Sequence, residues 1–243
     1  MKNGYDEALS KQIFDLILKF ADYGFARAHA VSYSKIAYIM GYLKVHYPNY
    51  FYANILSNSI GSEKKTAQMI DEAKHQNINI LAPNINYSHW FYKATNKGIY
   101  LSIGAIKGVG YQSVKLIVDE RKENGNYKDF FDFTRRIPKR IKSRKLLEAL
   151  ILVGAFDTLG KNRATLLQSI DQVLDDVSDV EQDGFIFDVL TPKTNYEEKE
   201  ELPDKVLSDY EKEYLGFYVS THPVEKAFEQ KQYLGIYKLT NAR

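Results

Sequence analysis

Two glycines separated by one residue, with lysines on either side, suggest a binding chemistry in this chain. Gly108 and Gly110 follow an apolar segment and precede a stretch whose apolar residues Val114, Ile117 and Val118 recur at helical spacing. A backbone without Cβ atoms lets a phosphate approach closely, and the free N–H groups of a first helical turn, backed by the helix dipole, favour anions. We therefore expect an anion site formed by Lys107, Gly108, Val109, Gly110, Gln112, Ser113 and Lys115.

The surroundings of these glycines indicate which anion is bound. The segment lacks the Walker spacing of glycines followed by Lys-Ser/Thr, and no long parallel-strand pattern precedes it. A backbone clamp on a polynucleotide, in a helix-hairpin-helix, is therefore favoured over a nucleotide cradle. The alternative is that the two glycines only form a tight turn between a strand and a surface helix.

The charge distribution agrees with a polynucleotide partner. The 243 residues carry a formal net charge of +2, but residues 121–145 hold ten Lys/Arg against three Asp/Glu, and residues 175–213 hold fourteen Asp/Glu against four Lys/Arg. A basic block beside a phosphate-binding hairpin is typical of nucleic-acid binding, although it could also be a solvated loop. The chain has no cysteine, which excludes disulfides and thiolate metal sites, and no apolar run of membrane-spanning length.

Helices are expected on both sides of the hairpin. Residues 6–20 have the apolar periodicity of a core-facing helix, and a second helix is expected from about 28 to 47. Its tyrosines could stack on bases, but this spacing favours a helix-helix core. Arg27, His29 and Lys35 lie at or near its start, where cations oppose the dipole and suggest an anion; the alternative is plain surface charge.

A short strand segment and a second hairpin complete the expected fold. Residues 96–98, Asn-Lys-Gly, predict a β-hairpin. A helix at residues 143–153, broken at 154–157, and another opened by Asn162 form a second helix-hairpin-helix, and residues 124–138 form a packed connector with Arg135 and Arg136 outside. The fold class is mainly α, and two tandem units would grip both strands of a duplex through their backbones.

Several runs also resemble a known family. YGFARAHA (residues 23–30), AYIMGYLKVHYPNYFYANIL (37–56), LSIGAIKGVG (101–110), LLEALILVGAFDTLG (146–160) and YLGFYVSTHP (214–223) resemble the distal fingers and tandem helix-hairpin-helix region of the bacterial DNA polymerase III alpha subunit, DnaE type. The family usually reads Phe-Asn-Lys-Ser-His where this chain has FARAH. Arg27 keeps the positive charge, which implies a place near the incoming triphosphate or the template.

The resemblance implies a division into three parts. These are distal fingers (1–82), a β-hairpin with the tandem helix-hairpin-helix DNA-binding domain (83–176), and a clamp-docking segment, linker and helix (177–243) leading to an OB-type domain that the chain does not contain. The catalytic aspartates of the family would lie in a palm domain upstream, so this fragment should not polymerise DNA alone. We expect no cofactor and no metal site in it, and Mg²⁺ for the parent enzyme.

The resemblance also implies partners in a cytoplasmic, nucleoid-associated replisome. These are double-stranded primer-template DNA, the sliding clamp and the remaining polymerase domains and replisome subunits. Gln182, Phe185 and Phe187 are similar to the clamp-docking hexapeptide, with two aromatic anchors for an apolar groove; alternatively, both phenylalanines pack on this chain's own helices. Two other functional classes remain open: a non-enzymatic interaction scaffold with structural hairpins, and a self-contained nuclease or ligase-like enzyme.

Overall fold

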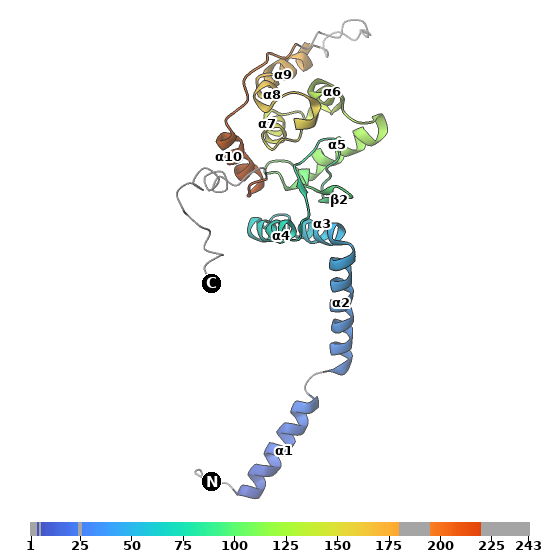
Figure 1. Ribbon diagram of the computed structural model, residues 1–243, viewed down its shortest axis with the longest axis vertical. Helices are drawn as coiled ribbons and strands as arrows, with labels where there is room; N and C mark the ends of the chain where they lie inside the picture. Colours follow the sequence, from blue (N-terminus) through green and yellow to red (C-terminus); the bar gives the residue numbers. More distant parts are fainter. Residues whose placement is uncertain (1–3, 5, 24–25, 180–194, 220–243) are drawn as a thin grey trace. The chain divides into compact units, whose positions relative to one another are not determined.

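The computed structural model describes residues 4, 6–23, 26–179 and 195–219 (Figure 1). The chain divides into two compact units, Met1–Phe51 and Tyr52–Arg243, and each is described here by itself. The first unit contains α1 (Glu7–Tyr23), α2 (Arg27–His46) and the beginning of α3 (Pro48–Asn58). Both long helices form where their apolar periodicity predicted them.

The expected burial of these two helices is wrong. Phe20 of α1 is 80% exposed and Tyr38 of α2 is 73% exposed, and no residue of α2 is buried. The periodicity of a helix indicates which side chains share a face, but burial also requires a surface that covers this face. Of the aromatic residues expected in a helical core, Tyr52 is buried, and its hydroxyl donates to Glu72 at 2.8 Å.

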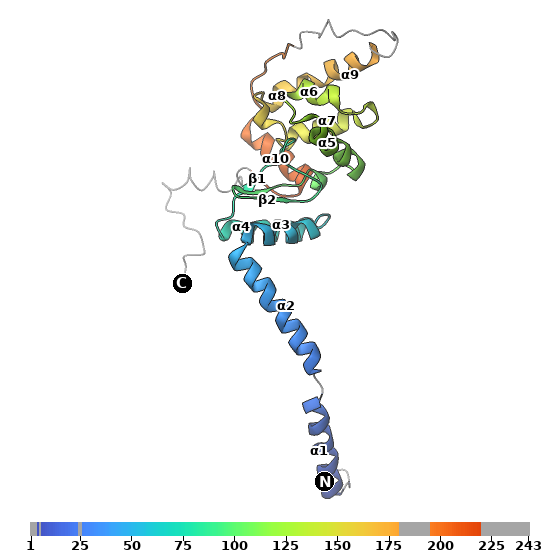
Figure 2. The ribbon, with the colours of Figure 1, turned by 90° about the vertical axis from the view of Figure 1, so that its right-hand side faces the viewer.

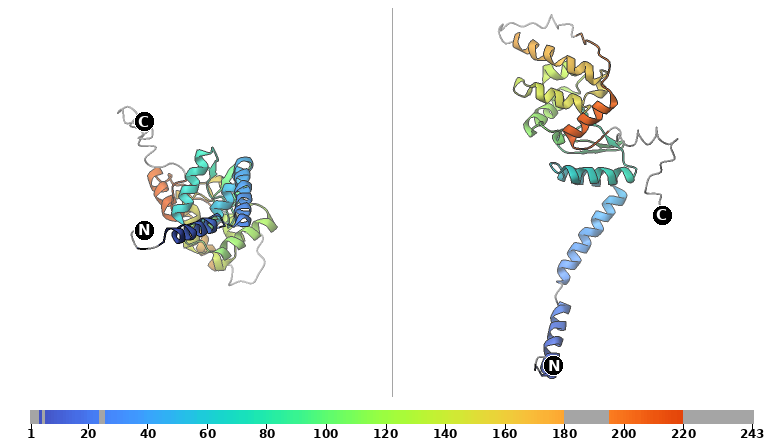
Figure 3. Two further views of the ribbon diagram at one scale, coloured as in Figure 1. Left: turned by 90° about the horizontal axis from the view of Figure 1, so that it is seen from below. Right: turned by 90° about the vertical axis from the view of Figure 1, so that its left-hand side faces the viewer.

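The second unit is mainly helical, as expected. After the end of α3 its helices are α4 (Glu63–His75), α5 (Tyr111–Asn124), α6 (Phe130–Arg136), α7 (Arg144–Leu152), α8 (Arg163–Gln168), α9 (Ile170–Asp179) and α10 (Asp204–Leu215), with 3₁₀ turns η1 (Ile103–Ala105), η2 (Lys139–Ile141) and η3 (Asp157–Leu159). A small sheet lies between the layer of α3 and α4 and the remaining helices (Figures 2 and 3).

The sheet contains the predicted β-hairpin. Strands β2 (Lys93–Thr95) and β3 (Gly98–Tyr100) pair antiparallel across Asn96 and Lys97. β1 (Ile80–Leu81) adds to β3 in parallel, so the strand order is β1-β3-β2. After β3 ends at Tyr100, the chain continues into η1 and the glycine hairpin.

The core of the second unit is built around α7, which packs against α8, α9 and α10. Aromatic rings of the connector (residues 124–138) pack against a ring of the second hairpin. The ring centroids of Phe130 and Phe133 lie 5.2 and 5.0 Å from that of Phe156, and the rings meet edge to face. Six apolar residues of α5 and of the connector are buried as predicted: Val114, Ile117, Val118, Phe130, Phe131 and Phe133. The ring contacts join the connector to the second hairpin unit.

Candidate nucleic-acid interface

The first glycine hairpin is the turn between η1 and α5. Gly108 has φ +86°, a conformation that side chains with a Cβ rarely adopt, and Val109 donates its amide to the carbonyl of Ile106 at 3.1 Å. The Val109 side chain is buried, with 6% exposed, so only its backbone can reach a ligand. Gly110 is the N-cap of α5. The buried Val109 side chain therefore anchors the hairpin to the core, while both glycines are exposed to solvent.

The amides at the start of α5 are open. Within the described part of the chain, the N–H groups of Gly110, Tyr111, Gln112 and Ser113 have no acceptor, and the first amide that bonds within the helix is that of Val114, to the Gly110 carbonyl at 3.1 Å. Gly110 and the first two helical residues are exposed, and no atom lies within 4 Å of the position that a Cβ on Gly110 would take. This end of a 14-residue helix can therefore accept an anion from solvent.

The two lysines predicted beside the hairpin both have acidic partners. The Lys107 ammonium lies 2.9 Å from Glu63 on α4, with both side chains 58% exposed. Lys107 also donates its amide to the Tyr214 carbonyl of α10 at 2.9 Å. Lys115 lies 3.9 Å from Asp119, one turn further along α5. Exposed ion pairs such as these stabilise a protein by only about 0–1 kcal/mol, so both lysines can exchange their carboxylate for a phosphate.

A third lysine lies at the hairpin, and sequence reasoning did not single it out. Lys145, in the first turn of α7, passes over Gly108: its Cε would lie 2.9 Å from a Cβ placed on that glycine. Lys145 was included in the basic block, but 37 residues separate it from Gly108 and no local pattern links the two. Only the tertiary fold, which places the first turn of α7 at the hairpin, brings them together.

The base of the hairpin is held by the segment between β1 and β2. Gly104 in η1 lies against the Trp90 ring, which leaves no room for a Cβ at this position. Trp90 also meets Tyr111 edge to face, with centroids 5.2 Å apart, and its carbonyl accepts from the Ser102 hydroxyl. Tyr111 is 53% exposed and therefore offers an aromatic ring next to the open amides.

The second hairpin, unlike the first, is filled by this chain's own side chains. Gly154 has φ +81°, and the Arg163 guanidinium and the Asp157 carboxylate occupy the space over it. A carboxylate takes the place of an external anion: Glu201 accepts from the amides of Arg163 at 2.9 Å and Ala164 at 3.0 Å. The amides of Arg163 and Ala164 at the start of α8 are thus not open, because an acidic segment downstream occupies them, and the grip of the second unit on a duplex stays a prediction.

That acidic segment is docked along the start of α8 by several contacts. The Asn162 amide donates to the Lys199 carbonyl at 2.8 Å, and the Lys199 amide donates to the Thr165 hydroxyl at 3.0 Å. Lys161 pairs with Glu198 at 2.6 Å, and the Tyr196 ring packs on Phe131 at 4.6 Å. The segment 196–201 is therefore part of the second hairpin unit.

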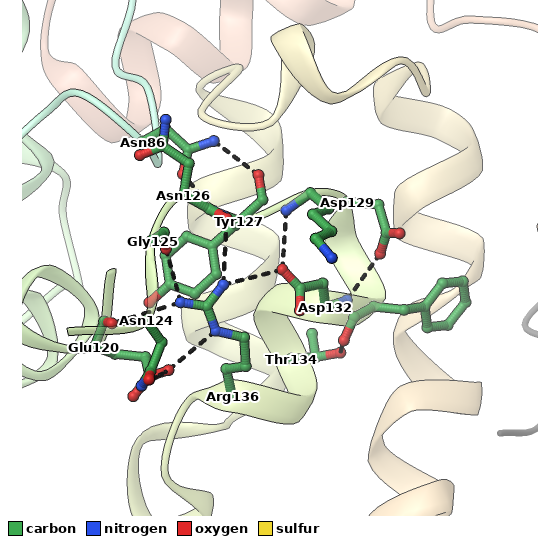
Figure 4. A network of polar contacts seen from close by, with 12 residues as sticks. Asn86, Glu120, Asn124, Gly125, Asn126, Tyr127, Asp129, Asp132, Thr134 and Arg136 are labelled. Carbon is green, nitrogen blue, oxygen red and sulfur yellow. Dashed lines mark hydrogen bonds and ion pairs between the residues drawn. The ribbon is translucent and has the colours of Figure 1, made fainter. Parts of the chain in front are cut away.

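Two arginines of the basic block serve the fold. Arg136, expected outside, donates to Glu120 at 3.0 Å, to Asp132 at 3.1 Å and to the Gly125 carbonyl at 2.8 Å, and lies over the Tyr127 ring (Figure 4). Arg121 is 7% exposed and donates to the carbonyls of Ile85 and Ser88, between β1 and β2. Each guanidinium satisfies backbone carbonyls that would otherwise be left without a donor.

The remaining cations of the block raise the local potential. Burial, and then the nearby Lys139 ammonium, lower the pKa of Lys142 on the approach to α7. Lys145, Arg140 and Arg135 are exposed. A phosphate in this region would relieve the repulsion between these like charges.

The other predicted contact residues lie away from this hairpin in sequence. Arg27, His29 and Lys35 are exposed on α2, in the first unit, and the His29 ring lies 4.2 Å from that of Tyr33. Gln182, Phe185 and Phe187 lie outside the described residues. Within the described ranges, no group of three or more His, Asp or Glu side chains could hold a metal ion. No described helix is long and apolar enough to cross a membrane.

Comparisons with known proteins agree with this geometry. A helix-hairpin-helix motif family matches residues 77–166. The chain is 81% identical over 239 residues to the DNA polymerase III subunit alpha of Staphylococcus epidermidis, an alignment that covers 98% of this chain and 22% of the relative. It is 77% identical over 242 residues to the subunit of the same name from Staphylococcus aureus, covering 100% of this chain and 23% of that relative. The chain thus spans less than a quarter of the length of these curated relatives.

Proposed function

The chain belongs to the DNA polymerase III alpha subunit family, and from this premise we propose that its first hairpin binds the sugar-phosphate backbone of duplex primer-template DNA. The observation that carries the proposal is the row of open amides from Gly110 to Ser113 at the exposed start of α5. The second hairpin, closed by Glu201, supports the first and does not bind phosphate through its own amides.

The proposed contact holds DNA without reading its sequence. N–H groups and ammonium groups bind phosphate oxygens, which are the same at every base pair, whereas sequence is read at base edges in the grooves. Gly108 and Gly110 let the phosphate approach the backbone, and the dipole of α5 favours its charge. In the complete polymerase this segment would hold the duplex, while nucleotidyl transfer would depend on carboxylates and Mg²⁺ outside this chain.

The test is a titration of a labelled duplex with the 243-residue chain, followed by fluorescence anisotropy at several salt concentrations. Lys107→Glu combined with Lys115→Glu should weaken binding and flatten the plot of log K against log salt, because each lost phosphate contact lowers its slope by roughly 0.9. Lys74→Glu combined with Lys97→Glu is the control. It makes the same change of charge at exposed positions of α4 and of the β2–β3 turn.

Two results would reject the assignment. One is unchanged binding by the variant with both hairpin lysines reversed. The other is an equal loss of binding by the control variant, since this would indicate a response to net charge alone rather than to the hairpin.

Two further contacts are proposed for the family's other partners. Arg27, His29 and Lys35 would lie near the template or the incoming triphosphate in the fingers; their exposure on α2 and the retained charge at Arg27 support this. Gln182, Phe185 and Phe187 would dock on the sliding clamp, supported by their resemblance to the docking hexapeptide and by the acidic residues around them. Alanine at all three positions should abolish retention by the clamp and leave duplex affinity unchanged.

A second candidate function is a protein-interaction scaffold. The apolar side chains of α1, such as Leu16 at 65% and Phe20 at 80% exposed, favour contact with another protein surface, as do those of α2. The remaining polymerase domains are the partners that family membership suggests. The duplex titration separates the two functions, because a scaffold with structural hairpins would show little salt-dependent binding.

A further inference from the structure

We infer that Lys145 of the second helix-hairpin-helix unit binds phosphate at the first hairpin, so that both units contribute residues to one phosphate-binding site. The inference rests on the proposed DNA-binding function and names a residue that carries it. Three observations lead to it: the position of the lysine over Gly108, its lack of an acidic partner, and its place in the first turn of α7.

The position of Lys145 depends on the missing side chain of Gly108. A Cβ on that glycine would lie 2.9 Å from Cε and 3.9 Å from Cδ of Lys145, so the stem of the lysine uses the space that the glycine leaves. The ammonium Nζ lies 3.7 Å from the same point, beside the hairpin backbone. A phosphate approaching Gly108 would meet the ammonium, and the open α5 amides begin two residues further along the chain, at Gly110.

The cations around the hairpin differ in their partners. Lys107 is paired with Glu63, Lys115 with Asp119, and Arg144 with Glu148 and Asp171. Lys145 is exposed and forms no ion pair or hydrogen bond with any residue in the described part of the chain. It can therefore bind a phosphate without first displacing a carboxylate, which the two predicted lysines cannot.

The position of Lys145 in the first turn of α7 also favours a bound anion. Ser143 caps this helix by accepting from the Leu146 amide at 3.3 Å, and Lys145 is its second residue. A cation in a first turn faces the positive end of the helix dipole, an unfavourable arrangement that a bound anion reverses. The neighbouring Arg144 is paired with the carboxylates of Glu148 and Asp171, whereas Lys145 has no carboxylate partner among the described residues.

The experiment compares Lys145→Ala with Arg144→Ala in the 243-residue chain. Both variants remove one positive charge from adjacent positions of α7, so they change the long-range field equally. Lys145→Ala should lower the slope of log K against log salt by roughly 0.9, whereas Arg144→Ala should leave it unchanged. Between about 50 mM and about 200 mM salt, the affinity advantage of the unsubstituted chain over Lys145→Ala should accordingly shrink roughly threefold. Lys145→Arg should retain the slope.

The outcomes separate this inference from the proposed function. If Lys107→Glu with Lys115→Glu lowers the slope but Lys145→Ala does not, the hairpin binds DNA and the role of Lys145 is refuted. Equal slope changes for Lys145→Ala and Arg144→Ala would refute it as well. If the unsubstituted chain shows no salt-dependent binding, the proposed function fails and the inference fails with it. Unfolding followed by the fluorescence of Trp90, the single tryptophan, checks that each variant is folded.

Discussion

Replacing Arg163 by methionine tests the idea that the second hairpin is a closed structural element. Arg163 is 7% exposed and donates to the Leu152 carbonyl at 2.8 Å and to Asp157 at 2.7 Å. It also lies 3.6 Å from Glu211 of α10, which is 2% exposed. One guanidinium thus joins the end of α7, the hairpin and α10.

The expected loss follows from what the substitution leaves behind. The buried Glu211 carboxylate would lose its contact with the Arg163 guanidinium, and the Leu152 carbonyl would lose a donor. Breaking a buried ion pair by removing one partner costs about 3–5 kcal/mol, whereas replacing both partners is often nearly neutral. The Asp157 side chain is 43% exposed, so its release to solvent adds little. We expect Arg163→Met to lower the free energy of unfolding by about 3–4 kcal/mol.

Urea unfolding of the 243-residue chain, followed by Trp90 fluorescence, measures this loss in the second unit. Adding Glu211→Gln to Arg163→Met should recover most of it, because the amide can still accept from the Val219 N–H, which lies 3.0 Å from Glu211. Arg144→Met is the control, since its pairs with Glu148 and Asp171 are largely exposed and each contributes only about 0–1 kcal/mol. The reasoning is refuted if Arg163→Met costs no more than this control, or if the double variant is as unstable as the single one.

Three further outcomes are expected. Glu201→Gln weakens the acceptor of the α8 amides, so it should lower unfolding stability by about 1 kcal/mol and leave duplex affinity unchanged; a loss of affinity would contradict the closed second hairpin. Burial, followed by the charges of Arg121, Lys93 and Lys122, lowers the pKa of His89 to about 4, so the fold favours neutral histidine. The contribution of neutral His89 to the free energy of unfolding should be complete above pH 6.5 and be lost as the pH falls toward 4. The urea midpoint should therefore vary less with pH over this range in His89→Gln than in the unsubstituted chain. Gly108→Ala forces φ +86° on a residue with a Cβ and should cost about 1–2 kcal/mol in urea unfolding, whereas Gly110→Ala, at φ −84° in open space, should cost clearly less.

Local features of the fold could be predicted from the sequence because they depend on neighbouring residues. The apolar spacing of Val114, Ile117 and Val118 predicts both α5 and its buried face. The Asn-Lys-Gly turn predicts the β2–β3 pair, and Asn162 predicts the start of α8, whose Thr165 amide it caps at 2.9 Å. The same local pattern located the first hairpin with its open amides.

Burial and function at a distance were decided by the tertiary structure. The apolar face of α1 has the periodicity of a core helix and is nevertheless exposed, because burial depends on what covers a face. The two hairpins look alike in sequence, but Glu201 reaches the second from 38 residues beyond Arg163 and fills it. Lys145 likewise reaches Gly108 only because the tertiary fold places the start of α7 at the first hairpin. Residue spacing determines backbone conformation over one or two turns. Which group occupies an anion-binding site is instead decided by contacts between segments far apart in the chain.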